Sequence, residues 1–277
     1  MLSRDINVIY RTTVPAGYTN PYMVFFFNGE ETVVSEYTTD ANGKLCFAFM
    51  GINPQKMGDN ISATLHATYG GEDVTNAVAT YSIRQYCVNQ LAKNPDAKLK
   101  TMISDLLVYG AKTQIYQNYK PEQLVTEGLS LTPSTFETLD ASYNKLSVTG
   151  EADPKIRYSS ATLQLSNSMT VLLGITTDDP TDYTFEVTVN GNTSVFDAGD
   201  LSYDGGKYYL AFRNVKATAF DSVITAVIKK DGVTVSEQLT YSVCTYIQKN
   251  QGSSNAELAE LLKAIYRYGE SAKMYEE

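Results

Sequence analysis

Two stretches of this chain begin and end alike: YSIRQYCVNQ (81–90) leads to YGAKTQIY (109–116), and YSVCTYIQKN (241–250) leads to YGESAKMY (268–275). The first residues of the two stretches, Tyr81 and Tyr241, stand roughly 160 positions apart. A match that keeps its spacing over this length indicates duplication of a whole folding unit rather than of a short motif. Such duplication is common in proteins that span distance or multiply weak binding, and less common in compact enzymes.

The match continues upstream of these stretches. Gly43–Phe49 recurs as Gly206–Phe212, and the pair Asn28-Gly29 recurs as Asn190-Gly191. We therefore expect two modules, residues 1–120 and 121–277.

The second module opens with a segment that has no counterpart in the first. Residues 121–158 are predicted to be largely linker, because prolines and a glycine interrupt them, whereas Ala161–Leu165 alternates like a strand. Asp5 aligns with Ser168, so the first copy lacks the strand that opens the second. We expect either that the chain was cut from a longer one or that the first copy is a shortened version.

Each copy has strand-like runs first and helical runs last. In the first copy the predicted strands are divided by turns such as Asn28-Gly29, Asp40–Gly43 and Gly70–Asp73, and Asn-Gly between apolar runs is a strong hairpin signal. The predicted strands are residues 6–10, 23–27, 32–34, 45–50, 61–69 and 74–81. Short strands separated by such turns indicate an antiparallel sandwich.

The hydrophobic period then changes to three and four residues. Residues 84–93 and 244–250 predict a short helix in each copy, and the apolar stripes of 99–110 and 258–272 predict a longer one after it. Gly110 and Gly269 recur inside the longer helices, where glycine costs about 1 kcal/mol relative to alanine. We expect close backbone packing at both, against the sheet or the short helix. The predicted fold is α+β: two tandem modules, each an antiparallel Ig-like β-sandwich followed by a C-terminal helical pair.

Composition describes an ordinary folded protein and excludes some partners. Of the 277 residues, 43% are hydrophobic and 19% charged, and the net charge of −9 argues against nucleic acid. No apolar run approaches the roughly 20 residues that a membrane-spanning helix needs. The chain starts without a secretion signal, as a fragment of a longer secreted protein would.

The three cysteines fall at positions that do not correspond between the copies. Cys46 aligns with Tyr209, Cys87 with Ile247, and Cys244 with Arg84. A disulfide framework should repeat with the module, so we predict buried thiols.

The sequence offers little catalytic or cofactor chemistry. His66 is the single histidine, in an alternating strand, and is interpreted as a surface or packing residue. The sequence has no Gly-x-Ser-x-Gly elbow and no phosphate-binding glycine loop. We predict that the chain is not an enzyme, with no catalytic, metal or cofactor-binding residues and no cofactor.

Two loops rich in aspartate and the abundant tyrosines are the remaining candidates. The aspartates could hold Ca²⁺, but solvated turn residues are the favoured interpretation because the first copy lacks them. Exposed tyrosines could stack on sugar rings, although the chain contains no tryptophan, the commonest such platform. The candidates are Asp178, Asp179 and Asp182, then Asp197, Asp200 and Asp204, then Tyr208-Tyr209 and the segment Tyr18–Tyr22.

At the helices, Tyr81–Tyr86, Leu106–Ala111 and Tyr116–Tyr119 resemble a repeated module of large surface proteins from anaerobic, clostridial-type gut bacteria. Ser159–Leu165 and Tyr241–Tyr275 are similar to the same pattern. The resemblance implies a cell-surface or secreted setting and assigns no activity and no functional residues.

The function predicted from these features is a non-catalytic extracellular structural or adhesion module of a bacterial cell-surface protein. The alternative is a carbohydrate-binding module accessory to a glycan-degrading enzyme. The sequence names no partner: a host or dietary glycan or protein is compatible with it, nucleic acid and membrane insertion are not. The expected location is extracellular or wall-associated.

Overall fold

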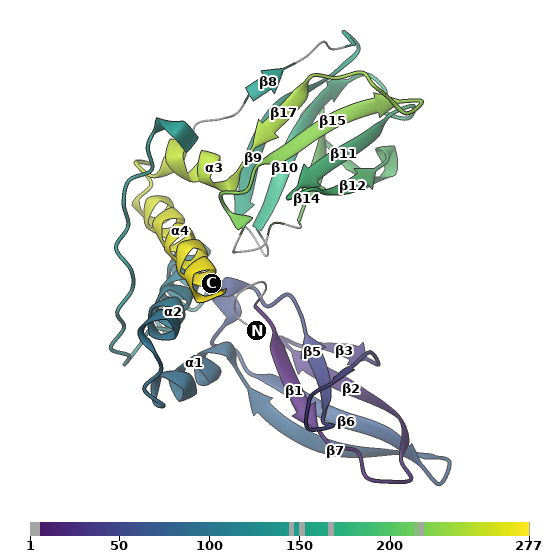
Figure 1. Ribbon diagram of the computed structural model, residues 1–277, viewed down its shortest axis with the longest axis vertical. Helices are drawn as coiled ribbons and strands as arrows, with labels where there is room; N and C mark the ends of the chain where they lie inside the picture. Colours follow the sequence, from purple (N-terminus) through teal and green to yellow (C-terminus); the bar gives the residue numbers. More distant parts are fainter. Residues whose placement is uncertain are drawn as a thin grey trace. The chain divides into compact units, whose positions relative to one another are not determined.

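The computed structural model describes residues 6–276 except 144–146, 150–152, 166–168, 214 and 216–218, and it does not describe the side chains of 77–79, 147–148 and 276. Two compact units divide the chain. Unit 1 comprises Met1–Ser134 with Glu270–Glu277, and unit 2 comprises Thr135–Gly269. The described residues form antiparallel sheets and helices of the predicted α+β class (Figure 1).

Unit 1 contains two antiparallel sheets. One has the strand order β1-β5-β4, and the other has the order β3-β2-β6-β7. Their bounds are β1 Val8–Thr12, β2 Thr19–Phe27, β3 Glu30–Val34, β4 Thr38–Thr39, β5 Leu45–Phe49, β6 Ile61–Tyr69 and β7 Glu72–Tyr81. The strands lie close to their predicted positions, and β4 is the one short strand that sequence did not indicate.

The Asn-Gly pairs form hairpins as predicted. Asn28 and Gly29 connect β2 to β3 with φ of 53° and 87°, and Asn190 and Gly191 adopt φ of 50° and 78°. Two successive residues with positive φ match the right-handed twist of the flanking strands. Asparagine and glycine tolerate this backbone region best, which explains why both copies use the same pair.

The core of unit 1 lies between its two sheets. β6 alternates buried and half-buried residues along its length, so one face of its sheet is apolar. Aromatic rings from the two sheets pack against each other. The ring centroid of Phe25 in β2 lies 5.3 Å from that of Tyr10 in β1 and 5.2 Å from that of Phe49 in β5. The buried Tyr10 hydroxyl donates to the Ile61 carbonyl at 2.7 Å, so its one polar group is satisfied.

Two helices follow the strands of unit 1, α1 (Ile83–Leu91) and α2 (Ala97–Tyr116). Ser82 caps α1 by accepting from the Gln85 amide, and Asp96 caps α2 by accepting from the Leu99 amide. Each cap satisfies a donor that the first helical turn would otherwise leave unpaired. α2 packs on α1 and on a short 3₁₀ helix, η1 (Pro54–Lys56).

Gly110 of α2 packs closely, but against different elements from those predicted. An added Cβ would stand 2.9 Å from Met57 Sδ, 3.1 Å from Val125 Cγ2 and 3.2 Å from the Pro54 carbonyl. The neighbours are therefore η1 and the segment that follows α2, not the sheet or α1. Gly269 is buried as well.

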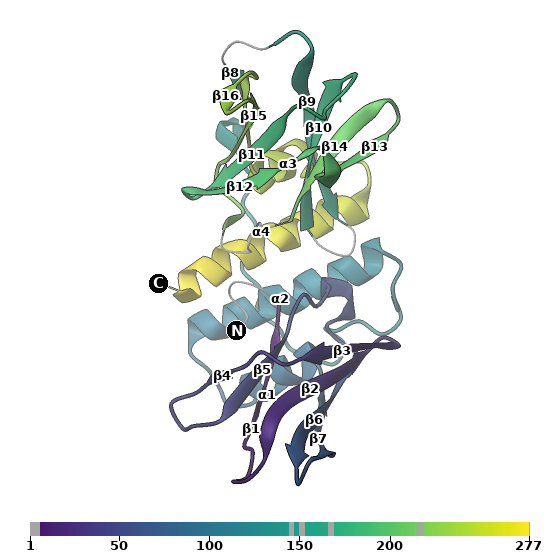
Figure 2. The ribbon, with the colours of Figure 1, turned by 90° about the vertical axis from the view of Figure 1, so that its right-hand side faces the viewer.

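Unit 2 also contains two antiparallel sheets. One has the order β13-β14-β10-β9, and the other has the order β12-β11-β15-β17-β8 with β16 paired to β15 (Figure 2). Their bounds are β8 Ser147–Thr149, β9 Ile156–Leu165, β10 Met169–Thr177, β11 Thr184–Val189, β12 Asn192–Phe196, β13 Leu201–Asp204, β14 Lys207–Phe212, β15 Ile224–Lys230, β16 Val233–Thr234 and β17 Gln238–Tyr241. Two further short 3₁₀ helices are η2 (Ala141–Tyr143) and η3 (Ala198–Asp200).

The strands of unit 2 are followed by helices α3 (Val243–Asn250) and α4 (Ala256–Glu276), and the last residues of α4, from Glu270 on, belong to unit 1. Ser242 caps α3 by accepting from the Thr245 amide, as Ser82 caps α1. Asn255 accepts from the Leu258 amide at the start of α4. The helices that the sequence predicted are thus present, and a side chain caps the first turn of each.

The region predicted to be largely linker contains packed residues as well as strands. Val125 and Leu139 are buried, and the Leu139 backbone exchanges two hydrogen bonds with the Gln251 side chain. β8 and the start of β9 also fall within residues 121–158. Three residues on which the sequence comparison and the linker prediction rest lie outside the described residues: Asp5, Gly150 and Ser168.

Candidate functional site

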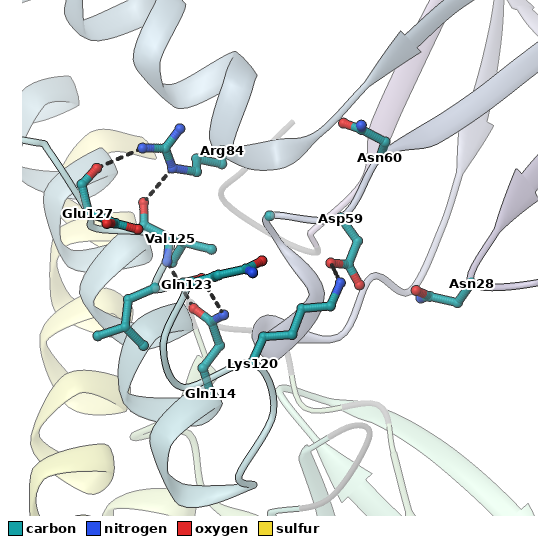
Figure 3. Close-up of a pocket in the computed structure, with 11 residues that line it drawn as sticks. Asn28, Asp59, Asn60, Arg84, Gln114, Lys120, Gln123, Val125 and Glu127 are labelled. Carbon is teal, nitrogen blue, oxygen red and sulfur yellow. Dashed lines mark hydrogen bonds and ion pairs between the residues drawn. The ribbon is translucent and has the colours of Figure 1, made fainter.

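A polar pocket of about 580 Å³ in unit 1 is the first candidate site (Figure 3). The turn after η1 forms one side of it and the segment after α2 forms the other. Its lining residues are Asn28, Gly58, Asp59, Asn60, Arg84, Gln114, Lys120, Gln123, Leu124, Val125 and Glu127.

Asp59 is one of two acidic residues that line this pocket, with Glu127, and two neighbours contact its carboxylate. Lys120 Nζ lies 2.6 Å from Asp59 Oδ1, and the Tyr119 hydroxyl donates to Asp59 Oδ2. The hydrogen bond to Asp59 raises the pKa of Lys120. Desolvation, and then the hydrogen bond to Asp59, raise the pKa of Tyr119. Each shift keeps a proton on the donor, so the trio stays bonded at neutral pH.

Arg84 and Gln114 hold the backbone of the segment after α2. Arg84 Nε donates to the Val125 carbonyl at 3.0 Å, and Arg84 Nη2 donates to the Glu127 carbonyl at 2.7 Å. The buried Gln114 side chain accepts from the Val125 amide at 2.9 Å and donates to the Gln123 carbonyl at 3.1 Å. These bonds satisfy backbone groups that no regular secondary structure pairs.

Several side chains of this pocket have structural roles. Asp59 is paired with a cation, while Arg84 and Gln114 direct their polar atoms at main-chain groups. The described lining contains no histidine or cysteine, and its second carboxylate belongs to the exposed residue Glu127. Nucleophilic catalysis needs a nucleophile beside a base, and the described lining presents no such pair.

Sequence analysis did not single out these pocket residues. For Arg84 a signal was available in the comparison of the two stretches, because Arg84 aligns with the less polar Cys244 within otherwise similar helices. A polar residue at a helix position that is less polar in the other stretch indicates a side chain that forms hydrogen bonds within its own unit. The acceptors of Arg84, the backbone carbonyls of Val125 and Glu127, are identified only in the folded chain.

His66 lies on β6 in a small polar cluster. Its Nδ1 is 2.8 Å from Asp73 Oδ2, and its ring stacks on Tyr22 with centroids 4.7 Å apart. The Tyr22 hydroxyl donates to the same carboxylate. Desolvation, followed by the nearby Asp73 charge, raises the pKa of Tyr22. The cluster joins three strands of one sheet, β2, β6 and β7, which fits the packing role predicted for His66.

The aspartate loops of unit 2 are built as turns. Asp179 accepts from the Thr181 amide and hydroxyl, and these bonds, the hydroxyl first, lower the pKa of Asp179. Asp182 lies 2.8 Å from Lys230 Nζ. Asp197 and Asp200 form a reciprocal cap of η3. In the part of the chain that the structure describes, no three side chains of His, Cys, Asp or Glu gather as a metal site would require.

The tyrosine candidates occupy two separate surfaces. In unit 2, Tyr208 contacts Tyr203, whose side chain is 65% exposed, with centroids 4.8 Å apart. In unit 1, Tyr18 stacks on the exposed Tyr69 at 4.5 Å.

Tyr18 also lines a groove of about 450 Å³ in unit 1. Thr13, Val14, Pro15, Tyr18, Leu65, Ala67, Val74, Thr75 and Asn76 line it.

The cysteines match their prediction in part. Cys87 and Cys244 are buried, Cys46 is half-buried, and none of the three is in a disulfide. Burial raises the pKa of the Cys87 thiol to about 12, so this thiol stays protonated and unreactive at physiological pH.

No helix in the described ranges is both long enough and apolar enough to cross a membrane. No protein-family model matches the sequence, and no curated protein matches it significantly.

Solved structures resemble the chain only weakly. One concerns the host cell surface retention of a 1.5-MDa bacterial ice-binding adhesin: identity is 10%, the TM-score is 0.22, and the match covers 87% of this chain. This chain spans 57% of the length of that one.

Two others are titin structures. A chimeric Z1Z2 tandem carrying a fibronectin GRGDS peptide is 9% identical, with a TM-score of 0.18 and coverage of 86% and 90% of the two chains. The fragment A168169 is 10% identical, with a TM-score of 0.19 and coverage of 87% and 89%. Similarity this low carries no argument about fold or function.

Proposed function

We propose that this chain is a non-catalytic extracellular structural or adhesion module of a bacterial cell-surface protein, composed of two Ig-like copies, residues 1–120 and 121–277. One observation carries the proposal. In the 580 Å³ pocket, Arg84 and Gln114 direct their hydrogen bonds at the protein's own backbone, and Asp59 and Lys120 bond to each other. A site built for a substrate would leave convergent polar groups for it.

The residues that the copies share support the same function. They are hairpin residues such as Asn28-Gly29, helix caps such as Ser82 and Ser242, and packing positions such as the half-buried Phe49 and the buried Phe212. The polar groups that could carry chemistry, including His66 and the aspartate loops, occur in one copy only. Duplication has therefore preserved a shape and not a set of reactive groups, as a spacer or display scaffold requires.

Glycan arrays and mucin pull-downs with the full chain test this proposal. A structural module gives no saturable signal in either assay, with a tryptophan-bearing carbohydrate-binding module as the positive control. Saturable micromolar binding to a defined glycan would reject the structural function in favour of the alternative. Surface proteolysis of intact producing cells, read by mass spectrometry, tests the extracellular location: release of peptides from this chain supports it.

A carbohydrate-binding function is the alternative, and the exposed pair Tyr203 and Tyr208 favours it. Stacking on a sugar ring needs an accessible aromatic face, which Tyr203 offers. If a glycan binds here, Tyr203→Ala abolishes the signal, whereas Val195→Ala, at another exposed position of unit 2, leaves it unchanged.

A further inference from the structure

The two units differ in how completely their strand edges are covered. In unit 2, β10 pairs with β14 on one edge and with β9 on the other. In unit 1, β1 pairs with β5, and among the described residues no strand pairs with its other edge. The strands correspond, because Val8 pairs with Phe49 as Val171 pairs with Phe212, and the segments around Phe49 and Phe212 match in sequence.

The second sheet shows the same difference. β17 pairs with β15 and also with β8, which covers its outer edge. β7, which ends in the matching Tyr81-Ser82, pairs with β6 and forms the edge of its sheet in the described part of unit 1. In unit 2, β9 covers an edge of one sheet and β8 covers an edge of the other, whereas no described strand covers either corresponding edge of unit 1.

The 450 Å³ groove lies where the missing strand would run. In unit 2, Ile156 of β9 pairs with Thr177, and Thr177 corresponds to Val14, which lines the groove. Ile156 and Tyr158 are 0% and 5% exposed, so they fill the interior of unit 2.

A hydrogen bond places Tyr158 against the opposite sheet. Its hydroxyl donates to the Val227 carbonyl of β15. Val227 corresponds to Thr64, which precedes the groove residue Leu65. The apolar surface of Leu65, Ala67 and Val74 therefore lies where side chains equivalent to Ile156 and Tyr158 would pack.

We propose that unit 1 binds an extended polypeptide strand, which pairs antiparallel with the free edge of β1 and inserts two side chains into the groove. The partner strand has the pattern of β9: a large aliphatic residue, an aromatic residue two positions later, and then small and hydroxyl residues before a Leu-x-Leu end. Main-chain hydrogen bonds to an open edge supply affinity, and pockets for alternate side chains supply specificity. This activity goes beyond the structural function proposed above.

A second copy of the chain fits this site less well than a separate strand. A second copy that paired through its own β1 would present Val8 and Tyr10, alternate residues that are buried in its own core. Those side chains cannot enter the groove of a neighbour. An extended segment with its side chains free can fill the groove and pair with β1 at once.

A peptide in trans tests the proposal with the full chain. The probe is fluorescein-labelled DPKIRYSSATLQL, the sequence of residues 153–165, titrated by fluorescence anisotropy. We expect saturable micromolar binding, weakened at least tenfold when the isoleucine and tyrosine of the peptide are both replaced by serine. Absence of saturation, or equal binding by the serine peptide, would overturn the proposal.

Protein variants and hydrogen exchange locate the site. Val74→Lys in the groove is expected to weaken binding at least tenfold, while Val33→Lys, on an exposed position of β3, is expected to leave it unchanged. Amides of β1 should gain protection when the peptide binds. Protection confined to β10 would mean that the peptide exchanges with β9 of unit 2, and self-association that the peptide does not compete with would identify a second copy; either result rejects the proposal. Because the serine peptide varies only the ligand, the test holds even if Val74→Lys fails to fold.

Discussion

At the scale of single residues, Gly110 shows how one missing side chain shapes unit 1. Met57, Pro54 and Val125 approach its Cα so closely that even a methyl group would displace them. Glycine destabilises the helix by about 1 kcal/mol relative to alanine. The close approach of η1 and of the segment after α2 buries apolar surface, and this burial offsets the loss. The same glycine appears in the other copy at Gly269, which is also buried.

Gly110→Leu is expected to lower the free energy of unfolding by about 1–3 kcal/mol, because overpacking forces the helix away from η1. Urea unfolding followed by circular dichroism measures the change. Ala97→Leu, at an exposed position of the same helix, is the matched control and is expected to be nearly neutral. Equal stability of the two variants would show that Gly110 is not a packing device.

Cys87 is expected to lower the free energy of unfolding as the pH becomes alkaline. Burial raises the pKa of its thiol from 9.0 to about 12 in the folded chain. Below pH 9 both states are protonated and the native state keeps its full stability. Between pH 9 and 12 the unfolded chain loses a proton that the native chain retains, so stability falls by up to about 1.4 kcal/mol per pH unit.

Cys87→Ala is therefore expected to flatten the decline of stability between pH 8 and pH 9, where no more than about a tenth of the tyrosines of the unfolded chain have ionised. The measurement is urea unfolding at half-unit pH intervals. Cys46→Ala, at a half-buried position, should retain the wild-type slope. An unchanged slope in Cys87→Ala would assign the pH dependence to other groups.

At the scale of elements, a capping serine joins strand to helix in both units. Ser82 and Ser242 follow the last residue of a strand, are buried, and accept from the amide three residues later at 3.0 Å. The chain changes from extended to helical at this residue because the serine oxygen satisfies an amide of the first turn.

Ser82→Ala and Ser242→Ala are expected to cost about 1 kcal/mol each, since each leaves one amide without its acceptor. Thermal unfolding measures both losses. Threonine at either position keeps the hydroxyl and should recover most of the stability. If alanine were tolerated at one position only, the two junctions would differ in their energetics despite their shared geometry.

At the scale of the whole molecule, two compact units with separate apolar cores predict two cooperative transitions. Calorimetry of the full chain is expected to resolve them, and Gly110→Leu should move one transition and leave the other in place. A single transition that shifts as a whole in this variant would show that the two units unfold as one.

Much of the architecture was predictable because it is locally encoded. Asn28-Gly29 predicted a hairpin because few residues tolerate positive φ, and the apolar stripe of residues 99–110 predicted a helix because its period is three and four residues. The packing partner of Gly110 was not predictable, since nothing local indicates that η1 and Val125 approach it. The polar pocket was not predicted for a similar reason. Arg84 bonds to backbone groups 41 and 43 positions along the chain, and Gln114 bonds to the irregular segment that follows its own helix.

The sequence by itself determined the alternation of strands and helices, their caps and turns, and the repetition of this pattern, because these depend on neighbours within a few residues. Only the tertiary structure decided which strand edges are covered, which polar groups are already bonded, and where the groove beside β1 opens. Those properties depend on segments that meet in space after long separations in sequence, and pairing across such distances leaves no periodic signal in the chain.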